Sequence, residues 1–442
     1  MSDVGGAAGK ILATFEDVVG IALPVRVRAW DGSQAGPTDS PARVTFRNRR
    51  ALRRVLWSPN ELGVARAYVS GDLEVDGDIY ALLDVPDLVE RIGAHRSRET
   101  GLRTLARAGG TFVRLGAVGP PPKPPTVEMR GRRGLRHTRA RDAASVTHHY
   151  DVGNEFYRLF LGPTMVYSCA YWSPGAATLE DAQAAKNEVV CRKLGLRPGM
   201  RLLDVGCGWG SMVLHAARHH GVDAVGITLS GEQLELARRR VADAGLSDRV
   251  EIRQQDYREL DDAPYDAISS IGMSEHVGVS RLVDYAGILH DHLRPGGRLL
   301  NHAIASVKPL PDTPSRAPSF IDRYVFPDGE ILPVSAVVDA LERGGLEIRD
   351  TESLREHYAL TLRAWVASLR ESYDRAVDLV GAERARTWLL YLAASALGFE
   401  YPYRLSVHQV LAVRPDASGA SGMARTRDGW YRDDPGHGRD RP

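Results

Sequence analysis

Three closely spaced glycines mark the stretch of this chain that is best suited to hold a ligand. Gly206, Gly208 and Gly210 follow the short apolar run 201–205, and the residues after them have the spacing of a helix. Glycine permits a tight turn, lets a ligand lie against bare backbone, and lets the helix start close to the strand. This order predicts a nucleotide-type ligand site, with Asp204 standing just before the first glycine.

Polar residues also follow the next two predicted strands, where a parallel sheet gathers its ligand-binding groups. These residues are Thr228, Leu229, Gln233, Gln255, Asp256 and Tyr257. Thr228 and Gln233 are the polar candidates in place of the acidic residue that usually holds ribose hydroxyls. Asp256 and Tyr257 have the chemistry to contact the edge and the face of adenine. Each residue alone is equally a helix cap or a turn residue, but together they predict a cofactor pocket.

These groups need a scaffold of alternating strands and helices. Buried strands are predicted at 201–206, 223–229, 249–255, 265–271, 297–304 and 404–413. Helices are predicted near 178–194, 210–219, 231–243, 281–293, 357–379 and 383–397, the first of them opened by the capping-box pair Thr178 and Asp181. This alternation predicts an α/β fold with a mostly parallel sheet covered on both faces, like the Rossmann fold.

The composition changes along the chain and predicts four regions. Residues 1–90 mix strand-like and helix-like segments and predict a small α+β domain. Residues 91–145 are rich in Pro and Arg and predict an exposed, semi-rigid linker. Residues 146–414 hold the glycine turn and form the predicted catalytic domain. Residues 415–442, rich in Gly, Arg and Asp, are predicted to be disordered.

The charges and cysteines argue against several classes of protein. The 57 Lys and Arg residues against 56 Asp and Glu give a formal net charge of +1, which is unlike a dedicated nucleic-acid binder. Cys169, Cys191 and Cys207 are too few and too scattered for a disulfide framework or a zinc site, so we expect no metal and a reducing compartment. No signal peptide and no membrane-spanning run are visible, which predicts a cytoplasmic location.

The glycine turn resembles motif I of the class I S-adenosylmethionine (AdoMet) methyltransferases. Four longer motifs closely resemble the cyclopropane-fatty-acyl-phospholipid synthases, including actinobacterial relatives that form methylene or methyl-branched fatty acids. The motifs are His148-His-Tyr-Asp-Val-Gly-Asn-Glu-Phe156, Tyr167-Ser-Cys-Ala-Tyr-Trp172, Gly272-Met-Ser-Glu-His-Val-Gly278 and Tyr324-Val-Phe-Pro-Asp-Gly329. The resemblance is strong over 146–413, and the N-terminal segment resembles the small extra domain of the phospholipid-acting members.

The resemblance implies transfer of the AdoMet methyl group to a cis double bond of an unsaturated acyl chain in a membrane phospholipid. Bicarbonate would then take a proton from the resulting carbocation. Matched residue by residue, the implied bicarbonate site is Cys169, Glu275, His302, Ile304 and Tyr358. The implied AdoMet contacts are Tyr167, Ser168, Gly206, Gly208, Thr228, Leu229, Gln233, Tyr257 and Ile271.

The residue types suit this chemistry. An alkene is a poor nucleophile and water would destroy the cation, so catalysis requires positioning and the exclusion of water. His302, Tyr358 and a backbone N–H are expected to hold the anion, whereas Glu275 must carry a proton or anchor His302. The aromatic residues expected to face the cation are Tyr150, Tyr171, Trp172, Tyr324 and Phe326.

Several alternatives stay open. Cys169 could be a small buried hydrophobe, His302 and Tyr358 core residues, and Glu275 a helix cap. The same bicarbonate residues would serve a cyclopropane or a methylene product, and a methylene product would need a separate reductase to become a methyl branch. A small-molecule O- or N-methyltransferase would share the fold but would have no use for bicarbonate. A non-catalytic lipid-binding protein is a third hypothesis.

The lipid substrate implies peripheral attachment to the inner face of the membrane. Residues 128–141 carry six arginines and one acid, which fits either a solvated linker or attraction to an anionic membrane. The apolar segment 320–326 is an alternative docking element. A homodimer is implied by the resemblance alone.

Overall fold

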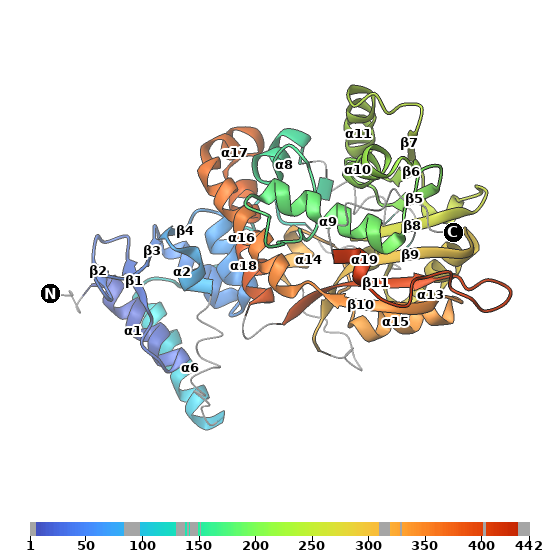
Figure 1. The fold of residues 1–442 in the computed structure, drawn as a ribbon. Helices are drawn as coiled ribbons and strands as arrows, with labels where there is room; N and C mark the ends of the chain where they lie inside the picture. The colour runs from blue at the N-terminus through green and yellow to red at the C-terminus, as the bar shows by residue number, and fades with distance from the viewer. Residues whose placement is uncertain are drawn as a thin grey trace. The chain divides into compact units, whose positions relative to one another are not determined.

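The computed structural model describes residues 6–83, 98–129, 138, 141, 149–150, 152–308, 319–327, 329–400 and 404–431. The chain forms two compact units, whose segments can be followed by colour in Figure 1. The first unit comprises Met1–Arg132, Ser315–Pro327 and Leu369–Pro402. The second unit comprises Arg133–Pro314, Asp328–Ser368 and Tyr403–Pro442, and it contains the glycine turn.

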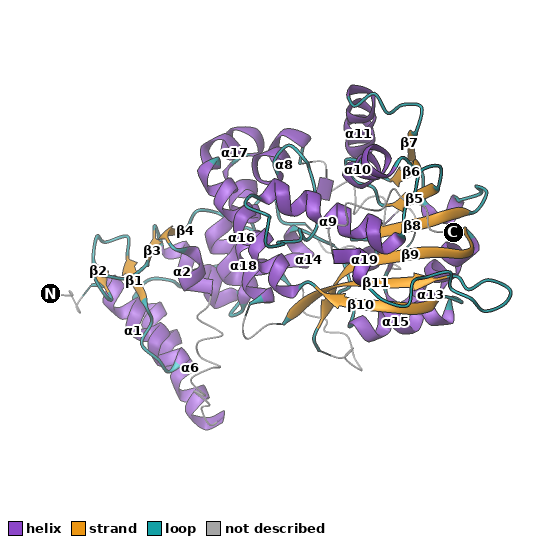
Figure 2. Cartoon of the chain, viewed as in Figure 1, coloured by secondary structure: helices purple, strands orange, loops and turns teal. Residues whose placement is uncertain are grey.

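A seven-stranded, mostly parallel sheet forms the centre of the second unit (Figure 2). Its strands are β5 (Arg201–Val205), β6 (Asp223–Thr228), β7 (Val250–Gln254), β8 (Tyr265–Ile271), β9 (Leu293–Ser306), β10 (Glu347–Ser353) and β11 (Leu405–Val413). They lie in the order β10-β11-β9-β8-β5-β6-β7. Neighbours from β9 to β7 run parallel, whereas β11 pairs antiparallel with β9 and with β10. This topology confirms the predicted α/β class.

Helices cover both faces of this sheet, because successive side chains of a strand point to opposite sides. Leu202 packs in a buried cluster with residues of α9, α10 and α11, whereas Leu203 packs in a second cluster with residues of α13 and α15. These helices are α9 (Leu179–Leu194), α10 (Ser211–His220), α11 (Gly231–Asp243), α13 (Leu282–Asp291) and α15 (Val334–Arg343). The sheet therefore lies between two hydrophobic cores.

The helix starts follow local sequence signals. Helix α9 has Thr178 at its N-cap, where the Asp181 N–H donates to the Thr178 hydroxyl at 3.2 Å and the Thr178 N–H donates to the Asp181 carboxylate at 3.0 Å. This reciprocal pair is the capping box that the sequence predicts. The remaining short elements of this unit are α8 (Asn154–Leu161), the 3₁₀ turns Tyr257–Glu259 and Val279–Arg281, α12 (Ser274–Val277), α16 (Arg355–Glu371) and α19 (Asp428–Tyr431).

Strand β10 has no counterpart among the predicted strands. Its sequence, Glu-Ile-Arg-Asp-Thr-Glu-Ser, lacks an apolar run, and it is the edge strand held by antiparallel pairing with β11. The single helix expected over 357–379 is divided into α16 and α17 (Tyr373–Val380). Both differences arise from tertiary context, which outweighs local propensity in an edge strand or at a helix junction.

The first unit contains a four-stranded sheet in the order β2-β1-β3-β4, as expected for a small α+β domain. Its strands are β1 (Val25–Arg28), β2 (Gln34–Ala35), β3 (Ala42–Phe46) and β4 (Leu73–Gly77). Its helices are α1 (Ala7–Val19), α2 (Arg49–Trp57), α3 (Glu61–Val69), α4 (Ile79–Leu83), α6 (Arg98–Arg114), α14 (Phe320–Tyr324), α17 and α18 (Ala382–Phe399).

Four described helices of the first unit, α6, α14, α17 and α18, lie outside the range 1–90 expected for it. Helix α6, in place of part of the expected linker, packs on α1 with the Phe112 and Phe15 ring centroids 5.8 Å apart. Helix α18, expected in the catalytic domain, packs on α3 and α4. Apolar side chains spaced along a helix supply these contacts even where Arg and Gly dominate the composition.

The tail is ordered as far as the structure describes it. Met423 and Trp430 pack against the cluster that contains Leu202, and the Lys193 ammonium lies 5.9 Å from the Trp430 ring centroid. Residues 415–431, expected to be disordered, therefore contact the fold, and the rest of the tail lies outside the described residues. Within the described ranges, no helix is long and apolar enough to cross a membrane.

Candidate active site

The glycine turn between β5 and α10 has a backbone conformation that suits glycine. The φ angles of Gly206, Gly208 and Gly210 are 76°, 55° and 79°, all in the left-handed region. A Cβ on Gly206 would lie 2.5 Å from the sulfur of Met273. The Gly206 N–H donates to the Ile227 carbonyl at 3.0 Å, which ties the turn to β6. Glycine at 206 therefore leaves the space that the Met273 side chain occupies at the carboxyl end of β5.

A cavity opens beside this turn, at the carboxyl ends of β5, β6 and β8. The Thr228 hydroxyl donates to Gln233 Oε1 at 2.8 Å, while Gln233 Nε2 faces the turn, 3.9 Å from where a Cβ on Gly208 would lie. Most cofactor residues expected from the sequence line this cavity. They are Tyr167, Ser168, Asp204, Gly206, Gly208, Thr228, Leu229, Gln233, Gln255, Tyr257 and Ile271.

Two expected cofactor residues lie outside the lining. Gly210 is the N-cap of α10. The Asp256 carboxylate accepts the Arg258 N–H at 2.9 Å and the Arg258 Nε–H at 2.8 Å. Arg258 itself lines the cavity, and its guanidinium carbon lies 5.2 Å from the Tyr257 ring centroid. Asp256 therefore orients Arg258, and its contact with adenine stays a prediction.

A buried charge pair, Lys186 and Asp204, also lines the cavity. Burial raises the pKa of Asp204 to about 6, against the hydrogen bond from the Ser269 hydroxyl at 2.6 Å and the charge of Lys186. Burial lowers the pKa of Lys186 to about 8, and Asp204 opposes that shift. Lys186 is not among the residues predicted from the sequence. The one sequence feature that points to it is its spacing from Gln183 and Asn187, which places three polar residues on one face of α9. All three are buried.

Aromatic rings form one wall of the cavity. Tyr150, Tyr167 and Trp209 line it, with the Tyr150 ring centroid 5.8 Å from that of Trp209 and 6.4 Å from that of Tyr167. The Trp209 indole N–H donates to Asn154 Oδ1 at 2.6 Å, and the Tyr167 ring lies 5.4 Å from that of Trp365. This wall offers aromatic faces to a cation. Of its members, only Tyr150 and Tyr167 were singled out from the sequence.

Glu275 holds the backbone of Ile304. Its Oε1 accepts the Ile304 N–H at 2.7 Å, whereas Oε2 is buried and has no hydrogen-bond partner among the described residues. Strand β8 ends at Ile271, which pairs with His302 of β9. Beyond that point β8 offers no carbonyl to Ile304, and Glu275 supplies the acceptor instead. Burial raises the pKa of Glu275 to about 7. The Ile304 N–H is thus paired with Glu275, and the place of Ile304 in a bicarbonate site stays a prediction.

His302 is buried and neutral. Burial lowers its pKa to about 3, with further lowering by the charges of Lys186 and Lys193. The Gln409 amide nitrogen lies 3.4 Å from Nδ1, while Nε2 has no hydrogen-bond partner within the described ranges. When Nδ1 accepts from the amide, a neutral imidazole carries its proton on Nε2. His302 then presents an unused N–H donor.

The Cys169 thiol and the backbone N–H of Tyr358 both lie against the carbonyl of Leu354. The Cys169 Sγ lies 3.7 Å from that oxygen, and the Tyr358 N–H donates to it at 3.0 Å. Burial raises the pKa of the Cys169 thiol well above its usual range, so the thiol keeps its proton. Lys186 interacts electrostatically with both Cys169 and His302.

The other expected aromatic residues fall into two places. The backbone N–H of Trp172 donates to His357 Nδ1 at 2.8 Å, and the Tyr171 ring stacks on the His357 ring with centroids 4.7 Å apart. Both residues are therefore anchored to α16. Tyr324 and Phe326 belong to the first unit, where the buried Tyr324 hydroxyl donates to Glu128 at 2.9 Å.

The seven-stranded sheet, the glycine turn after β5 and the cavity at the strand ends define a class I AdoMet methyltransferase fold. Coclaurine N-methyltransferase bound to N-methylheliamine and SAH shares this fold with a TM-score of 0.52 and 19% identity, over 63% of this chain and 90% of that chain.

The sequence narrows this class to one family. Residues 137–410 match the mycolic acid cyclopropane synthetase family, and the chain belongs to it. It is 43% identical to a probable fatty acid methyltransferase of Mycobacterium tuberculosis, over 90% of this chain and 92% of that protein. It is 38% identical to the cyclopropane-fatty-acyl-phospholipid synthase of Escherichia coli, over 57% of this chain and 63% of that protein.

A solved member of the family supports the same assignment. The mycolic acid cyclopropane synthase CmaA1, complexed with SAH and CTAB, matches with a TM-score of 0.58 and 34% identity, over 61% of this chain and 97% of that chain. The chain is therefore an AdoMet-dependent methyltransferase.

Proposed function

We propose that the protein transfers the AdoMet methyl carbon to the cis double bond of an unsaturated fatty acyl chain in a membrane phospholipid. Bicarbonate held in the site would assist loss of a proton, giving a cyclopropane or a methylene fatty acid. One observation carries this proposal. His302 Nε2 and Glu275 Oε2 are buried near the end of β8 without a hydrogen-bond partner among the described residues. An unpaired buried polar atom costs about 1–3 kcal/mol, so each of these atoms favours a polar partner such as a small anion or its proton.

The cavity fits AdoMet on the chain's own features. The open backbone at Gly208 allows close approach, and Thr228 orients the Gln233 amide toward it. The Tyr150, Tyr167 and Trp209 rings present π faces that favour a sulfonium cation. Bound AdoMet would supply an electrophilic methyl group, and the residues around it would position the acceptor and exclude water.

The relatives support an acyl substrate. The two relatives compared above are named for fatty acids and for fatty-acyl phospholipids, and the first overlaps 90% of this chain. A double bond needs no general base aimed at a heteroatom before methyl transfer. It needs a base only afterwards, when the carbocation must lose a proton.

The polar residues of the expected bicarbonate site are better suited to hold a base than to act as one. With a pKa of about 3, His302 is a weak base at neutral pH, and the Cys169 thiol keeps its proton. His302 Nε2–H can donate to an anion, and so can Glu275 when protonated, as its pKa of about 7 allows. The Cys169 thiol and the Tyr358 hydroxyl are further donors. These groups fit bicarbonate, which would supply the base.

The product depends on where the cation lies when the proton leaves. With the cation on the carbon next to the methyl-bearing carbon, loss of a proton from the transferred methyl group closes a cyclopropane ring, whereas a 1,2-hydride shift that moves the cation to the methyl-bearing carbon, followed by loss of a proton from the methyl group, gives a methylene group. Either route releases one proton to the base and leaves S-adenosylhomocysteine. A methylene product would require a separate reductase to become a methyl branch. A homodimer stays a prediction.

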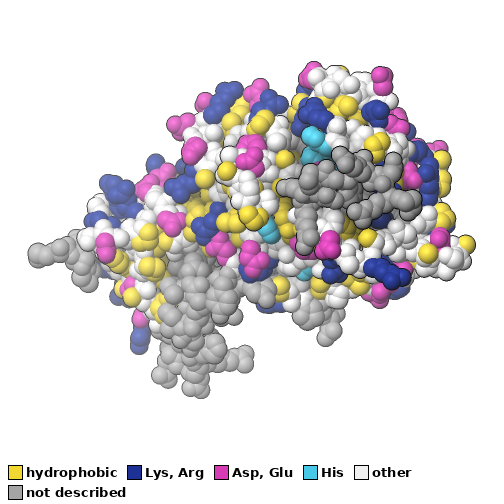
Figure 3. Space-filling view, in the orientation of Figure 1, with side chains coloured by type: hydrophobic (Ala, Val, Ile, Leu, Met, Phe, Trp, Pro, Cys, Tyr) yellow, Lys and Arg dark blue, Asp and Glu magenta, His cyan; other side chains and the backbone are white. Residues whose placement is uncertain are grey.

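Access to the membrane requires an apolar surface with basic neighbours. Segment 320–326, expected as a docking element, does not serve, because Phe320, Tyr324 and Val325 are buried. In the first unit, Trp57 and Val118 are 57% and 60% exposed, and the Trp57 indole N–H donates to the Gly119 carbonyl. Figure 3 shows Lys and Arg side chains near hydrophobic ones on the face in view.

Arginine belongs to the same surface. The Arg53 guanidinium lies 2.9 Å from where a Cβ on Gly119 would be, next to Trp57 and Val118. An aromatic and apolar surface with Arg beside it favours an anionic phospholipid bilayer. We take this surface as the membrane contact. Most of the arginine-rich segment 128–141 lies outside the described residues.

The proposal is tested with purified protein, AdoMet carrying a labelled methyl group, and phospholipid vesicles. Vesicles of unsaturated acyl chains should gain label in the acyl fraction, whereas fully saturated vesicles should not. His302→Ala should abolish the gain, and His290→Ala, at a histidine on α13, should retain it. Label on small-molecule amines or hydroxyls, with none on unsaturated lipid, would contradict the proposal.

A further inference from the structure

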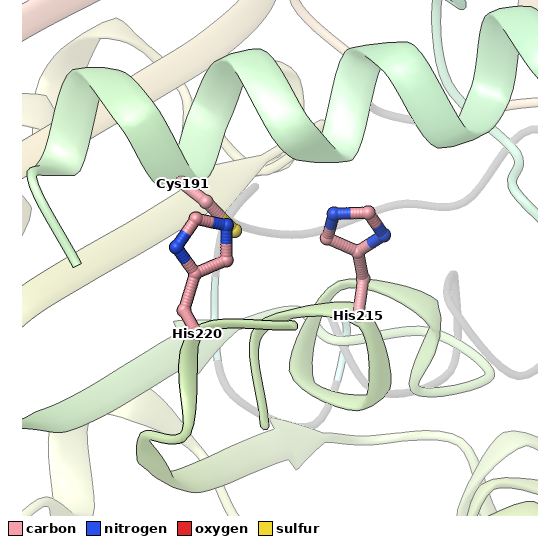
Figure 4. A group of neighbouring side chains, drawn as sticks. All are labelled: Cys191, His215 and His220. Atoms are coloured by element: carbon pink, nitrogen blue, oxygen red, sulfur yellow. The ribbon is translucent and has the colours of Figure 1, made fainter. Parts of the chain in front are cut away.

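A second group of chemistry-bearing side chains lies between α9 and α10, and the proposed methyl transfer does not use it. Cys191, His215 and His220 each bring one ligand atom to within 4.8 Å of the other two. Figure 4 shows the three side chains extending into the space between the two helices, Cys191 from α9 and the histidines from α10. Cys191 is buried and the histidines are partly exposed, so the group is closed on one side and accessible on the other.

A fourth donor lies beside the two histidines. Glu188 Oε2 lies 3.1 Å from His215 Nε2 and 3.0 Å from His220 Nε2. In a tetrahedral site with bonds of about 2.0–2.1 Å, ligand atoms are about 3.3 Å apart, so each histidine nitrogen already lies at nearly the required distance from the carboxylate oxygen. Glu188 and Cys191 lie three residues apart on α9 and therefore share one face of that helix.

The carboxylate is also held from behind. The Arg192 Nε–H donates to Glu188 Oε1 at 2.7 Å, which leaves Oε2 for the histidines. Outer hydrogen bonds of this kind fix the orientation of a metal ligand. Figure 3 shows histidine atoms at the surface where Figure 1 places α10, which gives an ion a route of entry.

We propose that Glu188, Cys191, His215 and His220 form a binding site for a divalent transition-metal ion, with zinc as the ion that best fits one thiolate, two imidazoles and one carboxylate. Tetrahedral sites of mixed Cys, His and carboxylate ligands are typical of zinc. On binding, the Cys191 thiol releases its proton to solvent and both imidazoles bind through a nitrogen lone pair.

The site would have a structural effect. Helix α9 carries Lys186, which lines the cofactor cavity, and α10 begins directly after the glycine turn. An ion shared by α9 and α10 would clamp the two elements that support one side of that cavity. A ligand that binds only the folded state raises its stability. The metal is therefore a structural clamp and takes no part in methyl transfer.

The experiment uses the full chain without an affinity tag, stripped with a chelator and then titrated with zinc. Zinc content after gel filtration and competition with a chromophoric chelator should give one tight ion per chain, together with a raised Tm. Cys191→Ser and His215→Gln should each weaken zinc binding by more than about 100-fold, because loss of even an outer partner typically costs 10–100-fold. His219→Gln, which removes a neighbouring imidazole of the same helix, should retain the site.

Cobalt substitution reads out the ligands directly and does not depend on any variant. Wild-type protein loaded with Co²⁺ should show the intense d–d bands of tetrahedral coordination and a thiolate-to-cobalt charge-transfer band. Cys191→Ser should lose the charge-transfer band. Less than one zinc per chain, an octahedral cobalt spectrum in the wild type, or unchanged affinity in both ligand variants would overturn the proposal. None of these measurements depends on methyl transfer.

Discussion

Glu275 Oε1 accepts the Ile304 N–H at 2.7 Å, just beyond the point where β8 stops pairing with β9. The carboxylate thus replaces a strand carbonyl and fixes the stretch of β9 that carries His302. Its second oxygen stays buried and unpaired among the described residues. One side chain therefore links the end of the sheet to the proposed anion site.

Removing this acceptor should destabilise the fold. Glu275→Ala leaves the Ile304 N–H buried without a partner, which costs about 1–3 kcal/mol. Glu275→Gln keeps an acceptor oxygen and should lose much less. Chemical denaturation with CD detection should rank the free energy of unfolding as wild type, then Gln, then Ala. Equal values for the Ala and Gln variants would show that the hydrogen bond carries no weight.

The titration of Glu275 should make stability depend on pH. Its pKa rises from 4.5 to about 7 on folding, so the folded state holds the proton more tightly than the unfolded state. This contribution is complete below about pH 4.5 and is lost as pH rises to about 7, with a slope of at most about 1.4 kcal/mol per pH unit. Glu275→Gln should lack it.

Denaturation of both proteins at several pH values tests this directly. The difference in unfolding free energy, wild type minus Glu275→Gln, should fall as pH rises through that window. A flat difference would mean that the Glu275 carboxyl ionises in the folded state as it does in water, and a difference that rises with pH would mean that folding lowers its pKa.

Gly206 should tolerate no side chain. A Cβ there would lie 2.5 Å from the Met273 sulfur, at a φ of 76° that disfavours other residues. Gly206→Ala should weaken AdoMet binding at least about tenfold, with backbone strain of about 1–3 kcal/mol. The control is Gly287→Ala in α13, where a Cβ meets nothing within 4 Å. Calorimetric titration with AdoMet measures both, and equal affinities would contradict the tight turn.

Lys186 and Asp204 should behave as one unit. Lys186→Met strands the buried Asp204 carboxylate, and loss of one partner of a buried pair typically costs about 3–5 kcal/mol. Adding Asp204→Asn to that variant should recover part of the loss. A double-mutant cycle on unfolding should give a coupling of more than about 1 kcal/mol. Strictly additive effects would show that the two charges do not interact.

Trp57 should contribute to membrane binding. Trp57→Ala should lower binding to anionic vesicles at least about threefold, because Trp carries a large amphipathic ring into the interface. Added salt should weaken wild-type binding further, since arginine attraction is screened. Leu360→Ala, an exposed apolar residue of α16, serves as the control. Sedimentation with vesicles measures the bound fraction. Unchanged binding by the Trp57 variant would show that Trp57 is not part of the membrane contact.

The catalytic fold could be predicted because its strands are short apolar runs that end at glycine or polar residues. Strand β10 could not, because it is a polar edge strand that depends on pairing with β11. Most residues that line the cofactor cavity could also be predicted, because the carboxyl ends of the strands converge in a parallel sheet and polar residues follow each of those strands.

Lys186 escaped prediction because nothing local distinguishes a lysine that faces Asp204 from one that faces solvent. The pairing of Glu275 with Ile304, and of Cys191 with His215, needs the folded chain for the same reason. Their partners lie on elements that are far apart in sequence. Asp256 has a partner that is close in sequence, because its carboxylate accepts from Arg258 two residues away.

Alkylation of acyl double bonds is tested most directly in bacteria that express this chain, by gas chromatography and mass spectrometry of their fatty acids. We expect a gain of one CH₂ unit on unsaturated chains only. Co-elution with a cyclopropane standard would identify a ring, and easy hydrogenation to a methyl branch would identify a methylene group. Unaltered fatty acids, in cells where the protein is folded and binds AdoMet, would contradict the claim.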